Sequence, residues 1–178
     1  MLDLERLEAE LSQLPLYYYS FIDPNALEFS ERIRYICKTE CPMYNKTWAC
    51  PPAVGEVDTC RQKCLGYQNC LLLGTVAEVA DIADINETLA TRPAHEEITN
   101  EVRELFRAQG VEPYILSTEA CAECEHCAWE DGLPCRFPDR MHPCVESHGI
   151  NLIPVLEEQG LTFQYGENIV TWFSLLFF

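Results

Sequence analysis

Four closely spaced cysteines carry the strongest chemical signal in the sequence. They form the pattern C-x2-C-x2-C-x7-C with residues Cys121, Cys124, Cys127 and Cys135. A [4Fe–4S] cube is held by four thiolates, and the ligand run of bacterial ferredoxins also begins C-x2-C-x2-C. Structural zinc sites also use C-x2-C, but as two pairs separated by a longer stretch of chain. The spacing therefore favours an iron–sulfur cluster and leaves zinc as the alternative.

A second group of cysteines lies closer to the N-terminus, in the pattern C-x3-C-x8-C-P-P. Its members are Cys37, Cys41 and Cys50. Cysteine followed by proline recurs at iron–sulfur ligands, and proline fixes the backbone as the chain leaves the site. Because a cube needs a fourth ligand, three alternatives arise: Cys60 from the following helix, Cys144 from the distant loop, or an open iron that binds a substrate as a Lewis acid. We predict Cys60, which is nearest in the sequence.

Other side chains near these cysteines are predicted to support a cluster. Tyr44 and Trp48 lie within the first group, where their rings would keep water from a cluster and tune its potential. Arg136 follows the last cysteine of the other group and would offset the negative charge of thiolate ligands. Cys64 and Cys70 are expected to pack as small hydrophobic side chains, because free cysteine is among the most buried residue types.

The histidines and the short motifs add no further chemistry. His95, His142 and His148 show no metal-binding spacing with one another, so we expect them at the surface or beside a site. The sequence contains no G-x-G-x-x-G, no P-loop and no G-x-S-x-G, so nothing indicates nucleotide-driven work or a serine nucleophile.

Length and charge limit the kinds of protein this is. With 178 residues we expect a single domain over residues 1–178. The 29 acidic and 12 basic residues give a net charge of −17, which disfavours nucleic acid and anionic membranes as partners. The count of 11 cysteines is odd, and the acidic N-terminus is unlike a signal peptide. We therefore predict a cytoplasmic protein, in which thiols stay reduced.

Hydrophobic periodicity indicates the elements that must position the cysteines. We expect a small sheet packed with helices, in the α+β class or else α/β, with two long cysteine-rich metal-binding loops at about 37–60 and 118–144. The last strand is apolar on both faces, so it should lie in the centre of the sheet or at an interface. The expected helices cover residues 4–14, 98–106 and 152–158, and the expected strands cover 71–76, 114–116 and a hairpin of 161–165 with 169–177.

Taken together, the cysteine motifs resemble a prokaryotic family of predicted metal-binding proteins, a domain of unknown function that is common in anaerobes. The resemblance implies metal binding and supports iron–sulfur chemistry. Cys144 departs from the family pattern, in which we expect serine, and Cys60, Cys64 and Cys70 lie outside it. The residues that carry the resemblance are Cys37-x3-Cys41, Tyr44, Trp48, Cys50-Pro51-Pro52, Cys121-x2-Cys124-x2-Cys127, Pro134-Cys135-Arg136-Phe137-Pro138 and the segment 145–150.

These observations predict an iron–sulfur protein with one or two [4Fe–4S] clusters that passes single electrons to a partner enzyme in anaerobic metabolism. The acidic surface would select a basic face on that partner. The apolar C-terminal strand could form the interface of a homodimer. One alternative is an enzyme that activates a small substrate at an open iron. The other is a structural or interaction module in which zinc holds the two loops together.

Overall fold

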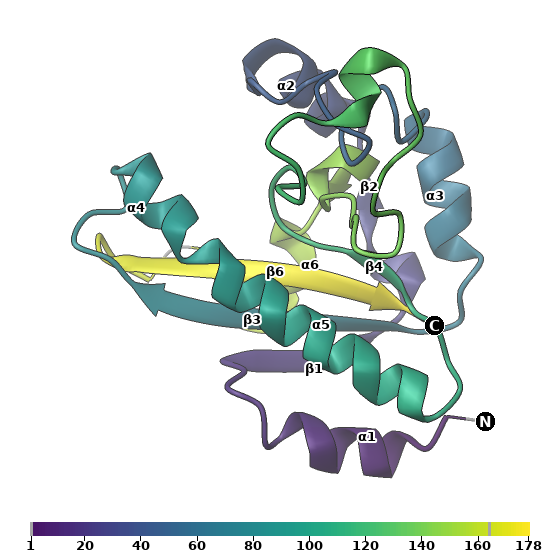
Figure 1. The fold of residues 1–178 in the computed structure, drawn as a ribbon. Helices are drawn as coiled ribbons and strands as arrows, with labels where there is room; N and C mark the ends of the chain where they lie inside the picture. Colours follow the sequence, from purple (N-terminus) through teal and green to yellow (C-terminus); the bar gives the residue numbers. More distant parts are fainter. Residues whose placement is uncertain (1, 164) are drawn as a thin grey trace.

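A computed structural model describes residues 2–163 and 165–178 as a four-stranded antiparallel sheet with helices on both faces (Figure 1). The strand order is β1–β3–β6–β4, and β2 pairs with β5 in a separate two-stranded sheet. Antiparallel pairing places the fold in the α+β class. The elements are α1 (Leu4–Leu11), β1 (Tyr18–Ile22), η1 (Pro24–Ala26), β2 (Glu28–Phe29), α2 (Glu31–Glu40), α3 (Val57–Leu65), β3 (Cys70–Glu78), α4 (Ile85–Ala90), α5 (Arg92–Ala108), β4 (Tyr114–Leu116), η2 (Ala128–Asp131), η3 (Glu146–His148), β5 (Ile150–Asn151), α6 (Ile153–Glu158) and β6 (Ile169–Phe177), where η marks a 3₁₀ helix.

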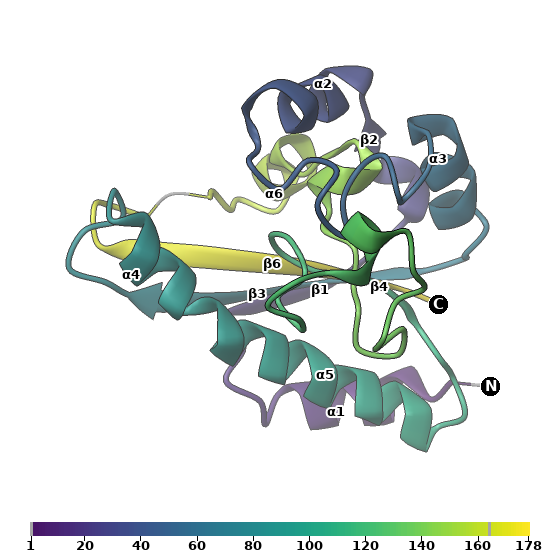
Figure 2. The same ribbon diagram turned by 45° about the horizontal axis from the view of Figure 1, so that its top comes forward.

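Helices cover both faces of the main sheet, which explains why its central strands are apolar on both sides. Leu71 and Leu73 of β3 pack with side chains of α1 and α5. Cys70 and Leu72 point to the opposite face, because side chains alternate along a strand, and pack with residues of α3 and α6. Figure 2 shows α1 and α5 on one side of the sheet and α2, α3 and α6 on the other.

Periodicity located most of the regular elements. The helix expected from the spaced leucines is α1, in which Leu7 and Leu11 are buried. The helix expected over 98–106 lies within α5. The central position predicted for the last strand is confirmed, because β6 lies between β3 and β4. None of the described helices is both long enough and apolar enough to cross a lipid bilayer.

The predicted hairpin between 161–165 and 169–177 is wrong. Residues 161–163 and 165 form no strand, and Gln164 of the expected strand lies outside the described residues. β3 pairs instead with β6 along its whole length, from Ile169 to Phe177. Phe163 packs edge-on against the ring of Phe173, with the ring centroids 5.2 Å apart. The segment before β6 therefore lies on the face of the sheet and adds no strand to its edge.

The two cysteine-rich segments differ in how regular they are. The first, 37–60, is less irregular than predicted, because it begins in the last turn of α2 and ends in the first turn of α3. The second, 118–144, contains η2 as its only helix or strand among the described residues. Only residues 41–56 of the first segment therefore form a loop between helices.

His95, which was expected at the surface or beside a site, is buried in the core. Its Nδ1 lies 2.8 Å from the Thr75 hydroxyl and its Nε2 lies 2.7 Å from the Ser174 hydroxyl. Burial, helped by the nearby Arg92, lowers the pKa of His95 to about 3, so the ring is neutral at physiological pH. The side chain thereby joins α5 to β3 and β6 through two buried hydrogen bonds.

Candidate metal centre

Four cysteines from three separate parts of the chain line one cavity of about 250 Å³. Cys37 and Cys41 come from the end of α2, Cys50 comes from the loop that follows, and Cys144 comes from the segment after β4. Four thiols around one cavity match the number of ligands that a [4Fe–4S] cube requires. The remaining walls are formed by Ile33, Ile36, Tyr44, Pro51 and Ala120, with the carboxylates of Glu119 and Glu146.

Helix α2 brings the first two cysteines to the cavity. It begins at Ser30, whose hydroxyl oxygen accepts a hydrogen bond from the Arg32 backbone N–H at 3.2 Å and so caps the helix. Cys37 lies in the last turn of α2, and Cys41 directly follows the helix as its C-terminal cap residue. The Cys37 thiol donates to the Glu146 carbonyl oxygen, with 3.8 Å between sulfur and oxygen. None of the residues of α2 is buried.

Cys144 is fixed by hydrogen bonds on both sides. It forms a parallel bridge with Ser117, whose N–H donates to the Pro143 carbonyl at 2.8 Å and whose carbonyl accepts from the Val145 N–H at 3.1 Å. The Ser147 N–H donates to the Cys144 sulfur at 3.3 Å, and the Ser147 hydroxyl donates to the Cys144 carbonyl oxygen at 2.6 Å. The position of this thiol is therefore set by the end of the sheet.

The thiols of Cys37, Cys50 and Cys144 are protonated at neutral pH when no metal is present. Burial is the main cause that raises the pKa of Cys37 to about 11, and the neighbouring Cys41 and Glu146 contribute to the same shift. Burial also raises the pKa of Cys50 and of Cys144. A coordinated metal ion deprotonates its thiol ligands. Loading of this site would therefore release protons and become more favourable as pH rises.

Cys60 lies away from this cavity. Its thiol donates to the Val54 carbonyl at 3.4 Å, and the Arg34 guanidinium donates to its sulfur at 3.7 Å. It lines a different cavity together with Lys63 and Tyr114. Cys64 and Cys70, which were predicted to pack as hydrophobic side chains, are fully buried in the core on the α3 side of the sheet.

The cysteines of the C-x2-C-x2-C-x7-C pattern lie in the loop between β4 and η3, and all four are half-buried. Burial raises the pKa of Cys121, and the neighbouring Cys135 and Cys127 contribute to the shift. Cys124 lies between Cys121 and Cys127 in the sequence. Cys127 also contributes to the raised pKa of Cys50.

The Arg136 side chain contacts other residues of the loop that carries these cysteines. Its guanidinium donates to the His126 carbonyl oxygen at 2.7 Å and lies 3.9 Å from the Asp131 carboxylate. The His126 ring faces the carboxylates of Glu130 and Asp131, at 3.6 and 3.1 Å. Arg136 thus joins the chain that follows Cys135 to the segment around His126.

Two tryptophans join the loops that carry the two groups of cysteines. Trp48 and Trp129 pack edge to face, with their ring centroids 4.7 Å apart. The Trp48 indole N–H donates to the Leu133 carbonyl at 3.0 Å, and the Trp129 indole N–H donates to Asn45 at 2.9 Å. Tyr44, in contrast, lines the cavity of the first group. Trp48 therefore connects the loops, while Tyr44 has a place beside the first group of cysteines.

In the described residues, His, Cys, Asp and Glu side chains form no group of three or more tight enough to hold a single metal ion.

The family of the chain is shown by its sequence. Residues 20–178 match the family described as "Predicted metal-binding protein (DUF2284)". The chain belongs to this family. The matched range of the DUF2284 protein includes all 11 cysteines. No curated protein and no solved structure matches the chain.

The structure of this DUF2284 protein adds residues to the first site that the local sequence pattern did not indicate. Glu119 and Glu146 line the cavity beside the cysteines. Neither lies within the first cysteine pattern. Cys144 was one of three alternatives for the fourth ligand. Iron–sulfur ligands are often followed by a proline, whereas Cys144 is preceded by one, so this pattern gave no preference for it.

Proposed function

We propose that this DUF2284 protein is an iron–sulfur protein that holds two [4Fe–4S] clusters and passes single electrons to a partner protein. The observation that carries the proposal is the cavity lined by Cys37, Cys41, Cys50 and Cys144. These four thiols would hold the first cluster, and the four cysteines of the C-x2-C-x2-C-x7-C pattern would hold the second. Such a cluster, when bound, accepts and releases an electron at a potential that its surroundings set.

The surroundings of the first cavity offer two opposing influences on that potential. The Ser147 N–H donates to the Cys144 sulfur, and hydrogen bonds to ligand sulfur favour the more negative, reduced state. The carboxylates of Glu119 and Glu146 line the same cavity, and negative charge there disfavours reduction. Apolar side chains such as Ile33 and Ile36 limit the access of water.

The test of the clusters is metal and acid-labile sulfide analysis of protein purified without oxygen, with absorption spectra before and after dithionite. We expect about eight iron and about eight sulfide per chain, because two cubes hold four of each. The broad visible absorption should bleach on reduction. About four irons would contradict a second cluster, and zinc without sulfide would contradict the redox function and favour the structural module.

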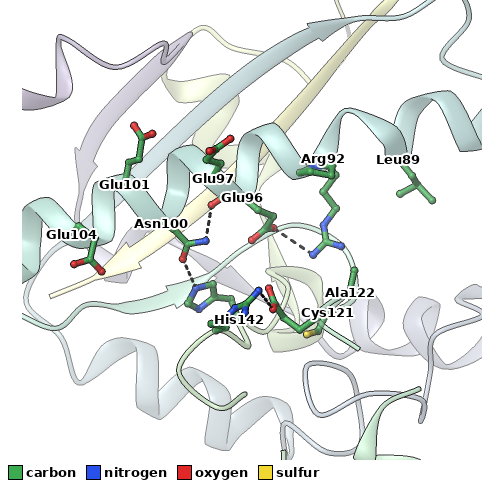
Figure 3. A pocket seen from close by; sticks show the side chains of 13 residues that line it. Leu89, Arg92, Glu96, Glu97, Asn100, Glu101, Glu104, Cys121, Ala122 and His142 are labelled. Carbon is green, nitrogen blue, oxygen red and sulfur yellow. Dashed lines mark hydrogen bonds and ion pairs between the residues drawn. The ribbon is translucent and has the colours of Figure 1, made fainter. Parts of the chain in front are cut away.

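A groove beside the second group of cysteines supports the proposal of a partner with a basic face. The groove has a volume of about 770 Å³ and runs between α5 and the loop that follows β4, with Cys121 in its wall (Figure 3). Arg92 pairs with Glu96 at 3.4 Å, and Arg140 pairs with Glu123 at 2.5 Å. The groove keeps an excess of carboxylates, since its charged side chains are Glu96, Glu97, Glu101, Glu104 and Glu123 against Arg92 and Arg140.

Small redox ions test whether this groove guides electron transfer. Hexaammineruthenium(III), a cation, should oxidise the dithionite-reduced wild-type protein quickly. We expect the rate of this oxidation to be lower in the Glu97→Lys/Glu101→Lys variant. At low salt the loss should be roughly tenfold, because a focused field of one sign raises the local concentration of the opposite ion. The reaction with hexacyanoferrate(III), an anion, should become faster in the same variant. Stopped-flow absorption measures both rates.

The matched control carries the same change of charge on the other side of the sheet. Glu157→Lys/Glu158→Lys alters two exposed residues at the end of α6. This variant should change both rates much less than the groove variant does, and high salt should remove the difference between them. Equal changes in the two variants would show that only the net charge matters and would contradict a docking role for the groove.

A further inference from the structure

A second cavity of about 410 Å³ is lined by residues that lie next to or near members of the first group of cysteines in the sequence. The loop after α2 places Trp48 in the second cavity and Cys50 in the first. The segment after β4 does the same, with Pro143 in the second cavity and Cys144 in the first. Two chain segments therefore contribute to both cavities, and each of these segments carries one of the proposed ligands.

The charge of this cavity is opposite to that of the protein. The chain has 29 acidic and 12 basic residues, yet among the described residues that line this cavity there is one lysine, Lys63, and no aspartate or glutamate. In the part of the chain that the structure describes, no ion pair joins Lys63 to a carboxylate, and its ammonium lies 3.6 Å from the centre of the Tyr114 ring. Much of the wall is apolar, with Trp48, Ile115 and Met141 among its members. These features suit an anion with an apolar body.

The hydrogen bonds of the cavity leave the Lys63 ammonium as its charged donor. The Ser147 hydroxyl donates to the Cys144 carbonyl, so His148 Nδ1–H must donate to the Ser147 oxygen at 3.1 Å. Burial lowers the pKa of His148 to about 3, so its ring is neutral and Nε2 accepts from the Tyr114 hydroxyl at 2.6 Å. Both ring nitrogens of His148 and the Tyr114 proton are thus already used. The same chain of bonds connects this cavity to Cys144.

We propose that this cavity binds a small monocarboxylate with an apolar body, whose carboxylate pairs with the Lys63 ammonium. One ammonium and one carboxylate match in charge, and the apolar wall accommodates the rest of the molecule. The site does not depend on the proposed electron transfer, because it is built from residues other than the eight proposed cluster ligands. It provides a place for a substrate or an effector beside the first group of cysteines.

Isothermal titration calorimetry of the anaerobically purified protein with benzoate tests this site. We expect saturable binding of one benzoate per chain at low ionic strength, and much weaker binding of benzamide, which has the same shape but no charge. Lys63→Met should weaken the binding of benzoate at least about tenfold, because a charge-assisted hydrogen bond is lost. Lys63→Arg should keep most of the affinity, since it retains the cation.

Arg61→Met is the matched control, because it removes one exposed cation from the same helix at a position outside the cavity. It should bind benzoate as the wild type does, and the iron content of all three variants should equal that of the wild type. Equal binding of benzoate and benzamide, unchanged affinity in Lys63→Met, or the absence of saturable binding would each overturn the proposal.

Discussion

Replacing Cys144 with alanine is expected to lower the iron content of the anaerobically purified protein from about eight atoms per chain toward about four. The cavity of the first group would then keep the thiols of Cys37, Cys41 and Cys50, one fewer than a complete cube requires. Alanine is preferred to serine because a hydroxyl at this position would leave an oxygen ligand beside the cavity. Iron and sulfide analysis, with the absorption spectrum, measures the loss.

Cys60→Ala is the control for this experiment, because Cys60 is also buried and is the nearest cysteine in the sequence. Its sulfur contacts Val54 and Arg34 and lies outside the first cavity. We expect this variant to keep the full iron and sulfide content. Loss of iron in Cys60→Ala together with normal iron in Cys144→Ala would refute the proposed ligand set and restore Cys60 as the fourth ligand.

Gly149→Ala is expected to destabilise the protein and to weaken the first site at the same time. Gly149 follows η3 with φ of +73°, and a Cβ atom there would lie 3.0 Å from the Ser30 carbonyl oxygen and 3.1 Å from the Val57 side chain. The left-handed conformation costs alanine about 1–2 kcal/mol, and overpacking adds about 1–3 kcal/mol. The free energy of unfolding should therefore fall by about 2–5 kcal/mol.

The effect on the first site follows from the contact between Gly149 and the start of α2. The Ser30 N–H donates to the Gly149 carbonyl at 2.7 Å, and Ser30 caps the helix that carries Cys37 and Cys41. Iron content should therefore fall together with stability. Urea unfolding followed by circular dichroism measures the stability. Gly160→Ala is the control, because Gly160 has φ of +71° with no atom within 4 Å of the added Cβ. A similar loss of stability in both variants would show that the contacts with α2 contribute nothing.

Local patterns predicted the parts of this fold that depend on local physics. The spacing of Leu7 and Leu11 located α1, and the apolar residues on both faces of β6 indicated a strand covered on both sides. The hairpin failed because β6 pairs with β3, which lies far away in the sequence. The choice of a pairing partner depends on contacts between distant segments, and neither periodicity nor turn residues report these.

The fourth member of the first group could not be chosen for the same reason. Cys144 follows Cys50 by about 94 residues (144 minus 50), and contacts between distant segments, such as the bridge between Cys144 and Ser117, fix its position. The sequence did contain one indication against Cys60. It lies on the same face of α3 as the buried Val57 and Cys64, a position where a free cysteine packs as a small hydrophobic side chain.

The role of the Trp48 side chain could not be predicted from the local sequence either. The sequence placed it within the first cysteine loop, where a role as a cover against water was the simplest interpretation. The structure pairs it with Trp129 and with the Leu133 carbonyl, both from the other loop. Substituting Trp48 would therefore disturb the contact between the two groups of cysteines as well as the surroundings of one.

Helix α2, which buries none of its residues, gives the proposed first cluster a second consequence. Packing contributes little to hold this helix, and Tyr35 and Ile36 are exposed on it. In the loaded protein, two metal–sulfur bonds would attach α2 to the body, so release of the iron would let the helix open locally at a small cost in free energy. Proteases cleave such locally opened segments. The lifetime of the chain would thereby depend on its iron, and molecules that lose the cluster would be degraded first.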